Sequence, residues 1–193
     1  RNHNSPYNSL CSYILTKMEC NNVAQVLPEK VIDLARLYWT HVPPENPYYS
    51  PGPDIDHYFG VEHDSQGYFP ASVYQTPIYS LLEASLYKTL DFIIEFSNYA
   101  AEKYVKSKLA ENEYETVPVW INEDTYIDQY MSNRLWCVYR GTQVNPDILE
   151  SMNMALEKFL VERGKNTPNE RLEKVLLSIL SRSNCYSTPR QDL

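Results

Sequence analysis

Glycine is scarce in this chain, with five residues among 193, and the motifs that depend on it are missing. The sequence contains neither a G-x-x-x-x-G-K-[ST] loop nor a G-x-G-x-x-G turn, so it supports no P-loop and no dinucleotide site. It also lacks an apolar run near the ~20 residues of a membrane-spanning helix. Its net charge of −8 repels a phosphate backbone. We therefore expect no membrane association, and binding to nucleic acid is disfavoured.

Catalytic and metal signatures are equally sparse. None of the four cysteines forms a C-x-x-C pair, which argues against a zinc knuckle and favours reduced, structural thiols in the cytoplasm. Cys137 could pair with His57 or His63 as nucleophile and base, but its neighbours Trp136 and Val138 favour a buried thiol. We predict no catalytic residue and no cofactor.

Most of the chain has helical periodicity. The first pattern places Leu10, Tyr13, Ile14 and Met18 on one stripe. A second helix places its apolar residues between Val31 and Tyr38 and ends before two prolines. The predicted helices cover residues 6–18, 28–41, 77–86, 87–108, 145–163 and 167–183. The helix over 87–108 has one broad apolar face formed by Leu90, Ile93, Ile94, Ser97, Ala100, Ala101 and Tyr104.

A change of period interrupts the helices. Val117, Val119 and Ile121 alternate with polar residues before a turn at 122–124, which predicts a β-hairpin over 115–131. Residues 134–140 fit a strand or a short helix equally well. We predict a mainly α fold, an irregular stack of helical hairpins with this inserted β-hairpin. Its expected parts are an N-terminal helix pair at 1–41, a Pro/Tyr-rich loop at 42–71, helical hairpins at 72–183 and a polar tail at 184–193.

The loop over 42–71 is unusual because it combines six prolines with many aromatic residues. Tyrosine is abundant throughout, with 17 residues against five phenylalanines, and its amphipathic ring suits contact surfaces. We interpret the loop as an ordered, Tyr-rich segment packed against the helices, and as a candidate contact surface. It also holds the weak metal candidates Asp56, His57, His63 and Asp64, whose spacing matches no zinc template.

A second contact candidate is the segment 132–142, which concentrates arginine, tryptophan and tyrosine. These residue types dominate binding hot spots. The alternative is that its aromatic residues anchor the hairpin and its arginines pair with nearby acids. Across both segments the predicted binding residues are Tyr58, Phe59, Tyr68, Arg134, Trp136, Tyr139 and Arg140.

Several stretches resemble a known family. PASVYQTPIY at 70–79, DFIIEF at 91–96, NRLWCVYRGTQ at 133–143 and ESMNMALEK at 150–158 are similar to the helical region of large bacterial STAND-type P-loop NTPases of antiviral defence. The likeness covers roughly residues 60–180. It implies a helical sensor or scaffold portion of an ATP-binding parent protein. No catalytic residue can be carried over, because the Walker motif is missing here.

The leading hypothesis is a helical interaction or sensing module that binds a protein partner or neighbouring domains of a parent chain. The start at Arg1 and the polar end lead us to expect a piece of a longer protein. The alternative is a small metal-dependent hydrolase built on the Asp/His-rich loop at 54–64. A purely structural spacer is a third possibility.

Overall fold

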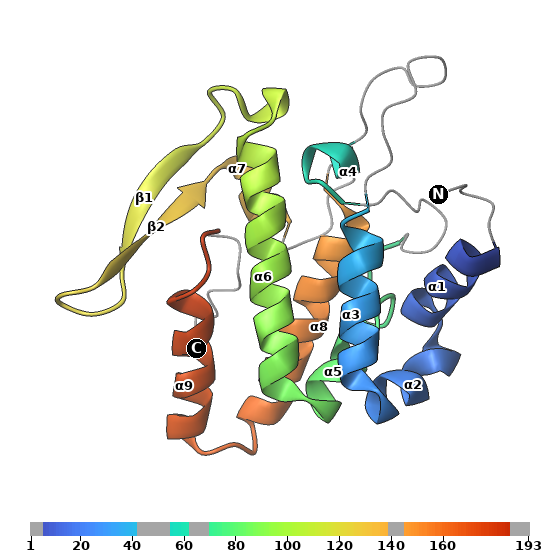
Figure 1. Ribbon diagram of the computed structural model, residues 1–193. Coiled ribbons are helices and arrows are strands. Elements are labelled where there is room, and N and C mark those ends of the chain that lie inside the picture. Colours follow the sequence, from blue (N-terminus) through green and yellow to red (C-terminus); the bar gives the residue numbers. More distant parts are fainter. Residues whose placement is uncertain (1–5, 42–54, 62–69, 139–144, 186–193) are drawn as a thin grey trace, which may run out of the picture.

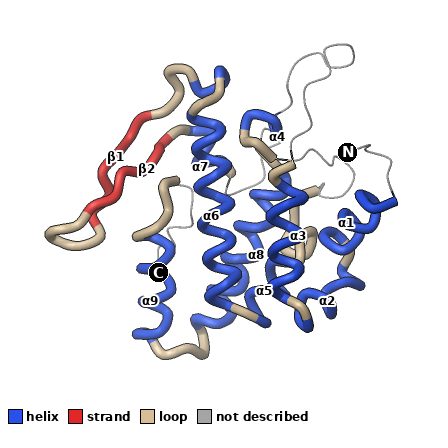
Figure 2. The backbone as a smooth tube through the Cα atoms, viewed as in Figure 1, coloured by secondary structure: helices blue, strands red, loops and turns tan. Residues whose placement is uncertain are grey.

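The computed structural model describes residues 6–41, 55–61, 70–138 and 145–185 of the chain, and it confirms a mainly α fold with one inserted β-hairpin (Figure 1). The longer helices gather side by side, and the hairpin extends from one side of this stack (Figure 2). The elements, in chain order, are α1 Pro6–Thr16, η1 Met18–Cys20, α2 Asn21–Val26, α3 Pro28–Trp39, α4 Ile55–Tyr58, α5 Ile78–Ala84, α6 Leu86–Val105, η2 Lys108–Ala110, β1 Glu115–Trp120, β2 Tyr126–Met131, α7 Asn133–Cys137, α8 Asp147–Gly164 and α9 Asn169–Leu180.

The 20-residue helix α6 is the centre of the stack. Its predicted apolar face is buried, apart from the half-buried Ser97. Phe92 and Phe96 are buried as well, so α6 is covered over a wider arc than periodicity alone predicted. The added cover comes from α3, where Trp39 lies with its ring centroid 5.8 Å from Phe92 and 5.5 Å from Phe96.

The N-terminal region differs from the predicted helix pair. Residues 21–26 form an additional short helix, α2, which contacts α5 and α3. The predicted first helix ends earlier, at Thr16, and Leu10, Tyr13 and Met18 of its apolar stripe are exposed. Cys11 and Leu15 are the buried apolar residues of this helix.

Helices α8 and α9 follow the prediction closely. α8 buries ten residues, from Ile148 to Leu160, and contacts α5. α9 buries Val175 and Ile179, and its end is attached to α6. There the Asn98 side chain donates a hydrogen bond to the Arg182 carbonyl over 2.8 Å and accepts one from the Asn184 amide over 2.9 Å.

The predicted hairpin is present with the predicted limits. β1 pairs with β2 in antiparallel register from Glu115↔Met131 to Trp120↔Tyr126. The Ile121 amide donates to the Thr125 carbonyl over 2.8 Å, and the Asn122 side chain accepts from the Asp124 amide within the turn. At its base, β2 forms a parallel bridge from Tyr130 to Cys185.

Only a short part of the Pro/Tyr-rich loop is described, and it contains α4. Phe59 follows this helix, is completely buried and stacks on Tyr104 at 4.9 Å. The interpretation of Phe59 as a surface contact is therefore corrected, because its ring is a core residue. Among the described residues no helix is both long enough and apolar enough to cross a bilayer.

Candidate functional site

The segment after β2 is a short helix, which decides between the two structures that the sequence allowed. Ser132 has extended backbone angles, and its hydroxyl accepts a hydrogen bond from the Leu135 amide over 3.0 Å. This N-cap starts α7, since serine satisfies an amide that has no partner within the helix. Leu135 and Val138 are buried beside the small residues Ala100 and Ala101 of α6. Packing on one side thus leaves the opposite side of α7 at the surface.

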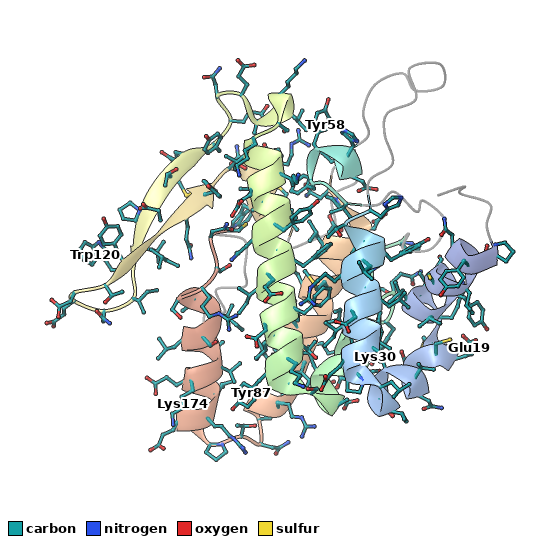
Figure 3. All side chains as sticks on the ribbon, in the orientation of Figure 1. Glu19, Lys30, Tyr58, Tyr87, Trp120 and Lys174 are labelled. Carbon is teal, nitrogen blue, oxygen red and sulfur yellow. The ribbon has the colours of Figure 1, made fainter. Side chains whose placement is uncertain are left out.

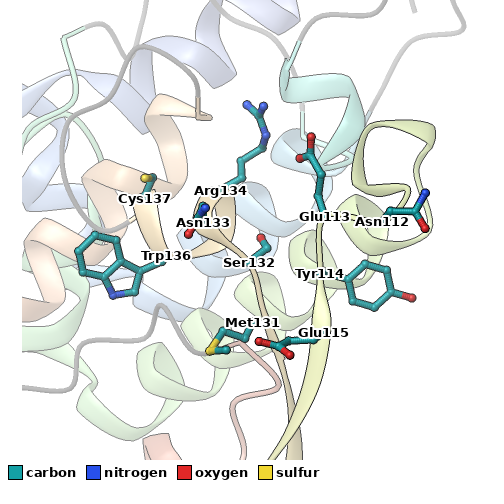
Figure 4. A pocket seen from close by; sticks show the side chains of 10 residues that line it. All are labelled: Asn112, Glu113, Tyr114, Glu115, Met131, Ser132, Asn133, Arg134, Trp136 and Cys137. Atoms are coloured by element: carbon teal, nitrogen blue, oxygen red, sulfur yellow. The ribbon is translucent and has the colours of Figure 1, made fainter.

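The outer side of α7 contributes to a hollow with a volume of about 900 Å³ (Figure 4). Three segments form its walls: the connection from η2 into β1, the end of β2, and α7 with its cap. The lining residues are Asn112, Glu113, Tyr114, Glu115, Met131, Ser132, Asn133, Arg134, Trp136 and Cys137.

Two of the predicted binding residues, Arg134 and Trp136, lie together in this hollow. The Trp136 side chain is 62% exposed, so its indole is available to a ligand or partner. Arg134 is half-buried, and in Figure 4 its side chain extends in the same direction as that of Glu113. Tyr68, Tyr139 and Arg140 lie outside the described residues, as do the metal candidates His63 and Asp64.

A buried tyrosine fixes one carboxylate of the hollow. The Tyr104 hydroxyl donates a hydrogen bond to Glu113 over 3.2 Å. Burial is the main cause that raises the pKa of Tyr104, while a hydrogen bond with Ser132 acts in the opposite direction. The same phenol thus connects the core of α6 to the acidic wall of the hollow, and it remains neutral and able to donate at physiological pH.

Sequence reasoning missed the wall contributed by residues 112–115. The signal was the hairpin register, because pairing Glu115 with Met131 brings the residues before β1 beside those after β2. Asn112 has a φ of 67°, a backbone conformation that asparagine tolerates better than most residues, and it turns the chain into the strand.

The hairpin carries a second set of aromatic residues, of which Tyr130 is half-buried against the core and the others are exposed. At its tip Trp120 is 62% and Tyr126 52% exposed, and their ring centroids lie 5.1 Å apart (Figure 3). At its base Tyr114 meets Tyr130 edge to face at 5.9 Å. Because side chains alternate along a strand, these four rings lie on one side of the hairpin. We call Tyr114, Trp120, Tyr126 and Tyr130 the aromatic face of the arm.

Both edges of the arm are unsuited to adding a strand. The hydrogen bond from the Ile121 amide to the Thr125 carbonyl marks a hydrogen-bonded pair of the ladder. Because hydrogen-bonded and non-hydrogen-bonded pairs alternate along antiparallel strands, the backbone groups of Pro118 face away from β2, at the outer edge of β1. Proline has no amide hydrogen to offer there. On the other strand, residue 184 occupies the edge at Tyr130, and Asp128 places a charge farther out. Contact through side chains is therefore favoured over edge pairing.

The Asp/His candidates are only partly described. Asp56 and His57 lie in α4 and are half-buried, with the His57 ring edge-on to half-buried Tyr58 at 6.3 Å. Within the described ranges no group of three or more His, Cys, Asp or Glu side chains is placed to hold a metal ion. Cys137 is half-buried at the hollow, and all four cysteines are free thiols.

The fold and the surface define a helical protein with a projecting two-stranded arm and a hollow at its base. Comparison with protein-family models and with curated proteins finds no match for this chain.

Proposed function

We propose that this chain is a helical interaction module that binds a protein partner through the aromatic face of the arm and the hollow at its base. The main support for this proposal is the Trp120–Tyr126 pair. Both rings are exposed at the tip of the arm, where few other side chains pack on them. An isolated two-stranded hairpin is marginally stable in water, so large exposed rings on it are best explained by a contact.

Charge specifies the kind of partner. The stretch 111–133, which includes the whole arm, has six acidic side chains and no lysine or arginine: Glu111, Glu113, Glu115, Glu123, Asp124 and Asp128. A basic protein surface complements this field, and its arginine or lysine side chains can also stack on exposed aromatic rings. The proposed partner is therefore a protein with a basic patch.

The setting we propose follows from the family resemblance. The module would belong to the helical sensor or scaffold portion of a larger ATP-binding protein of antiviral defence in the cytoplasm. Its partner is then a separate protein or a neighbouring domain of the same polypeptide. What supports this setting is the likeness of four stretches together with the helical architecture.

Site-specific photo-crosslinking tests the proposal. A photoreactive residue in place of Trp120 is expected to give a discrete crosslinked product in extracts of the native cells. The same residue in place of Tyr87, equally exposed at the start of α6, is the matched control. Mass spectrometry of the crosslinked peptides separates a second protein from another domain of the parent.

The doubly substituted chain Trp120→Ala/Tyr126→Ala should bind the captured partner at least about thirtyfold more weakly, because the loss of even one hot-spot aromatic residue costs about 2 kcal/mol or more. Binding by the unaltered chain should also weaken as salt is added. Equal crosslinking from positions 120 and 87, or unchanged affinity of the double variant with its circular dichroism intact, would contradict the proposed surface.

A further inference from the structure

A second surface, at the opposite end of the molecule from the arm, is also unaccounted for by the fold. Residues 7–27 hold seven large hydrophobic side chains that are exposed: Tyr7, Leu10, Tyr13, Met18, Val23, Val26 and Leu27. They belong to α1, η1, α2 and the residue after α2, which lie together at the end of the stack beyond α3 (Figure 1).

Helix α1 has one broad apolar arc, and only part of it is covered. Cys11 and Leu15 are buried, and among the described elements α1 packs mainly on α3 and η1. At 100° per residue, Tyr7, Leu10, Tyr13 and Ile14 fall within an arc of about 120° that adjoins the arc of Cys11 and Leu15. Tyr7 is 72% and Leu10 55% exposed. We call these four residues the outer stripe of α1.

A solvent-facing helix surface normally carries charged residues, and a helix that is hydrophobic all round is normally buried. α1 contains no charged residue at all. The whole stretch 6–27 has one lysine and one glutamate, Lys17 and Glu19, and is thus neutral within a chain of net charge −8. The polar residues of α1, Asn8, Ser9, Ser12 and Thr16, fall on one side of the helix, so the exposed outer stripe lacks the charged residues of an ordinary solvent-facing surface.

The charge distribution points to a second copy of the chain as that partner. Two copies of a molecule with net charge −8 repel each other over most of their surfaces. The arm cannot pair with its own copy without bringing six acidic residues against six more. The stretch 6–27 is the exposed apolar surface where two copies meet without that repulsion, and a surface that pairs with itself generates a closed twofold dimer.

We propose that the outer stripe of α1, extended by Val23 and Val26 of α2, is the interface of a homodimer. The two copies pack their uncharged helices against each other, and the acidic arms remain free for the partner. This inference does not depend on the proposed function of the arm.

Sedimentation equilibrium of the full 193-residue chain from about 1 to about 300 μM tests it, a range that covers typical weak dimers. The average mass should rise with concentration from 22.5 kDa toward twice that value. Added salt should leave the dimer unchanged or tighten it, because screening reduces the repulsion between like-charged copies. Added salt should instead weaken the proposed contact of the arm with its basic partner. The two proposals therefore predict opposite effects of salt, and either can fail without the other.

The substitution Leu10→Glu should weaken the dimer at least about tenfold, because a twofold axis places the new charge opposite its own copy. Leu177→Glu is the matched control, since Leu177 is an exposed leucine of α9 on the far side of α6. Tyr7→Lys is a second variant, to be used if Leu10→Glu alters the circular dichroism. A chain that stays monomeric throughout, or a dimer indifferent to both stripe variants, would overturn the inference.

Discussion

At the scale of single residues, Gly60 shows how one backbone conformation positions a core side chain. Its φ of 66° lies in the left-handed region, and two hydrogen bonds close the end of α4 around it: Gly60 amide to His57 carbonyl, 3.0 Å, and Val61 amide to Asp56 carbonyl, 2.9 Å. This pair of bonds is the Schellman arrangement, in which glycine is favoured because it has no Cβ. The closed turn keeps Phe59 inside, stacked on Tyr104.

The substitution Gly60→Ala should lower the free energy of unfolding by about 1 to 2 kcal/mol from the left-handed backbone alone. The new Cβ would also lie 2.8 Å from Lys103 Cγ and 3.0 Å from the Tyr99 hydroxyl, so both side chains must move. Urea unfolding followed by circular dichroism measures the loss.

Gly164→Ala provides the control for this measurement. Gly164 is the last residue of α8. A Cβ added there would lie 3.4 Å from Leu172 Cδ2, which is an ordinary van der Waals contact. Alanine is a better helix former than glycine, so this variant should be neutral or more stable by up to about 1 kcal/mol. A stabilised Gly60→Ala chain would show that the turn is not held in the left-handed conformation in solution.

At the scale of elements, α5 and α8 are joined by an aromatic and ionic contact. The Tyr79 ring meets Phe159 edge to face at 6.2 Å, and its hydroxyl donates a hydrogen bond to Glu162. Glu162 also accepts from Lys158 over 2.6 Å. The hydrogen bond to Glu162 is the largest cause that raises the pKa of Tyr79 to about 12, and burial adds to it.

This pKa predicts a loss of stability at alkaline pH with a defined sign. The neutral phenol donates the bond, so its contribution is fully present below the ordinary tyrosine pKa of 10.0 and is lost as pH rises through about 12. The difference in unfolding free energy between the unaltered chain and Tyr79→Phe should stay constant up to about pH 10 and then shrink.

Urea unfolding across this pH range is the measurement, with Tyr87→Phe as the control, because Tyr87 is an exposed tyrosine of α6. The absorbance titration of Tyr79 at alkaline pH is obtained by subtracting the curve of Tyr79→Phe from that of the chain that retains Tyr79. Its midpoint should move back toward pH 10 when the same difference is measured in a Glu162→Gln background. A midpoint near pH 10 in the unaltered chain would count against the hydrogen bond.

At the scale of the whole molecule, the contact of α3 with α6 helps to hold the N-terminal helices to the stack, together with the contact of α2 with α5. Exposed ion pairs cross the contact of α3 with α6, among them Arg36 with Glu95 at 2.8 Å. Such pairs contribute only about 0 to 1 kcal/mol each, because water already solvates both charges. The fully buried Trp39, packed on Phe92 and Phe96, is the larger contribution.

Trp39→Ala should therefore lower the free energy of unfolding by about 3 to 5 kcal/mol, the range for large aromatic truncations in a core. Leu37→Ala in the same helix should change it by no more than about 0.5 kcal/mol, because Leu37 is 65% exposed. The measurement is again urea unfolding by circular dichroism. Similar losses in both variants would mean that α3 does not pack as described.

Much of the architecture could be predicted because its signals are local. Alternation at Val117, Val119 and Ile121 gave the limits of the hairpin, and long periodic stretches located α6, α8 and α9. Short elements could not be predicted in the same way. The six residues of α2 carry less than two turns of pattern, and 134–140 has a short apolar centre between two arginines that fits a strand or a helix. The Ser132 cap settles the second case.

The candidate site was predictable only in part. Arg134 and Trp136 were found by residue type, but Glu113 and Tyr114 come beside them only through the pairing of β1 with β2. The sequence by itself determined a mainly α chain with an inserted hairpin, because periodicity depends on neighbours three or four positions away.

Only the tertiary structure decided which apolar surfaces are covered. Phe59 and Trp120 are both large aromatic residues, yet one is buried on Tyr104 and the other is exposed at the tip of the arm. Likewise α1 has one broad apolar arc, and only the part formed by Cys11 and Leu15 is buried within the chain. Burial depends on elements distant in the sequence, so a local pattern identifies an apolar face without specifying what packs on it.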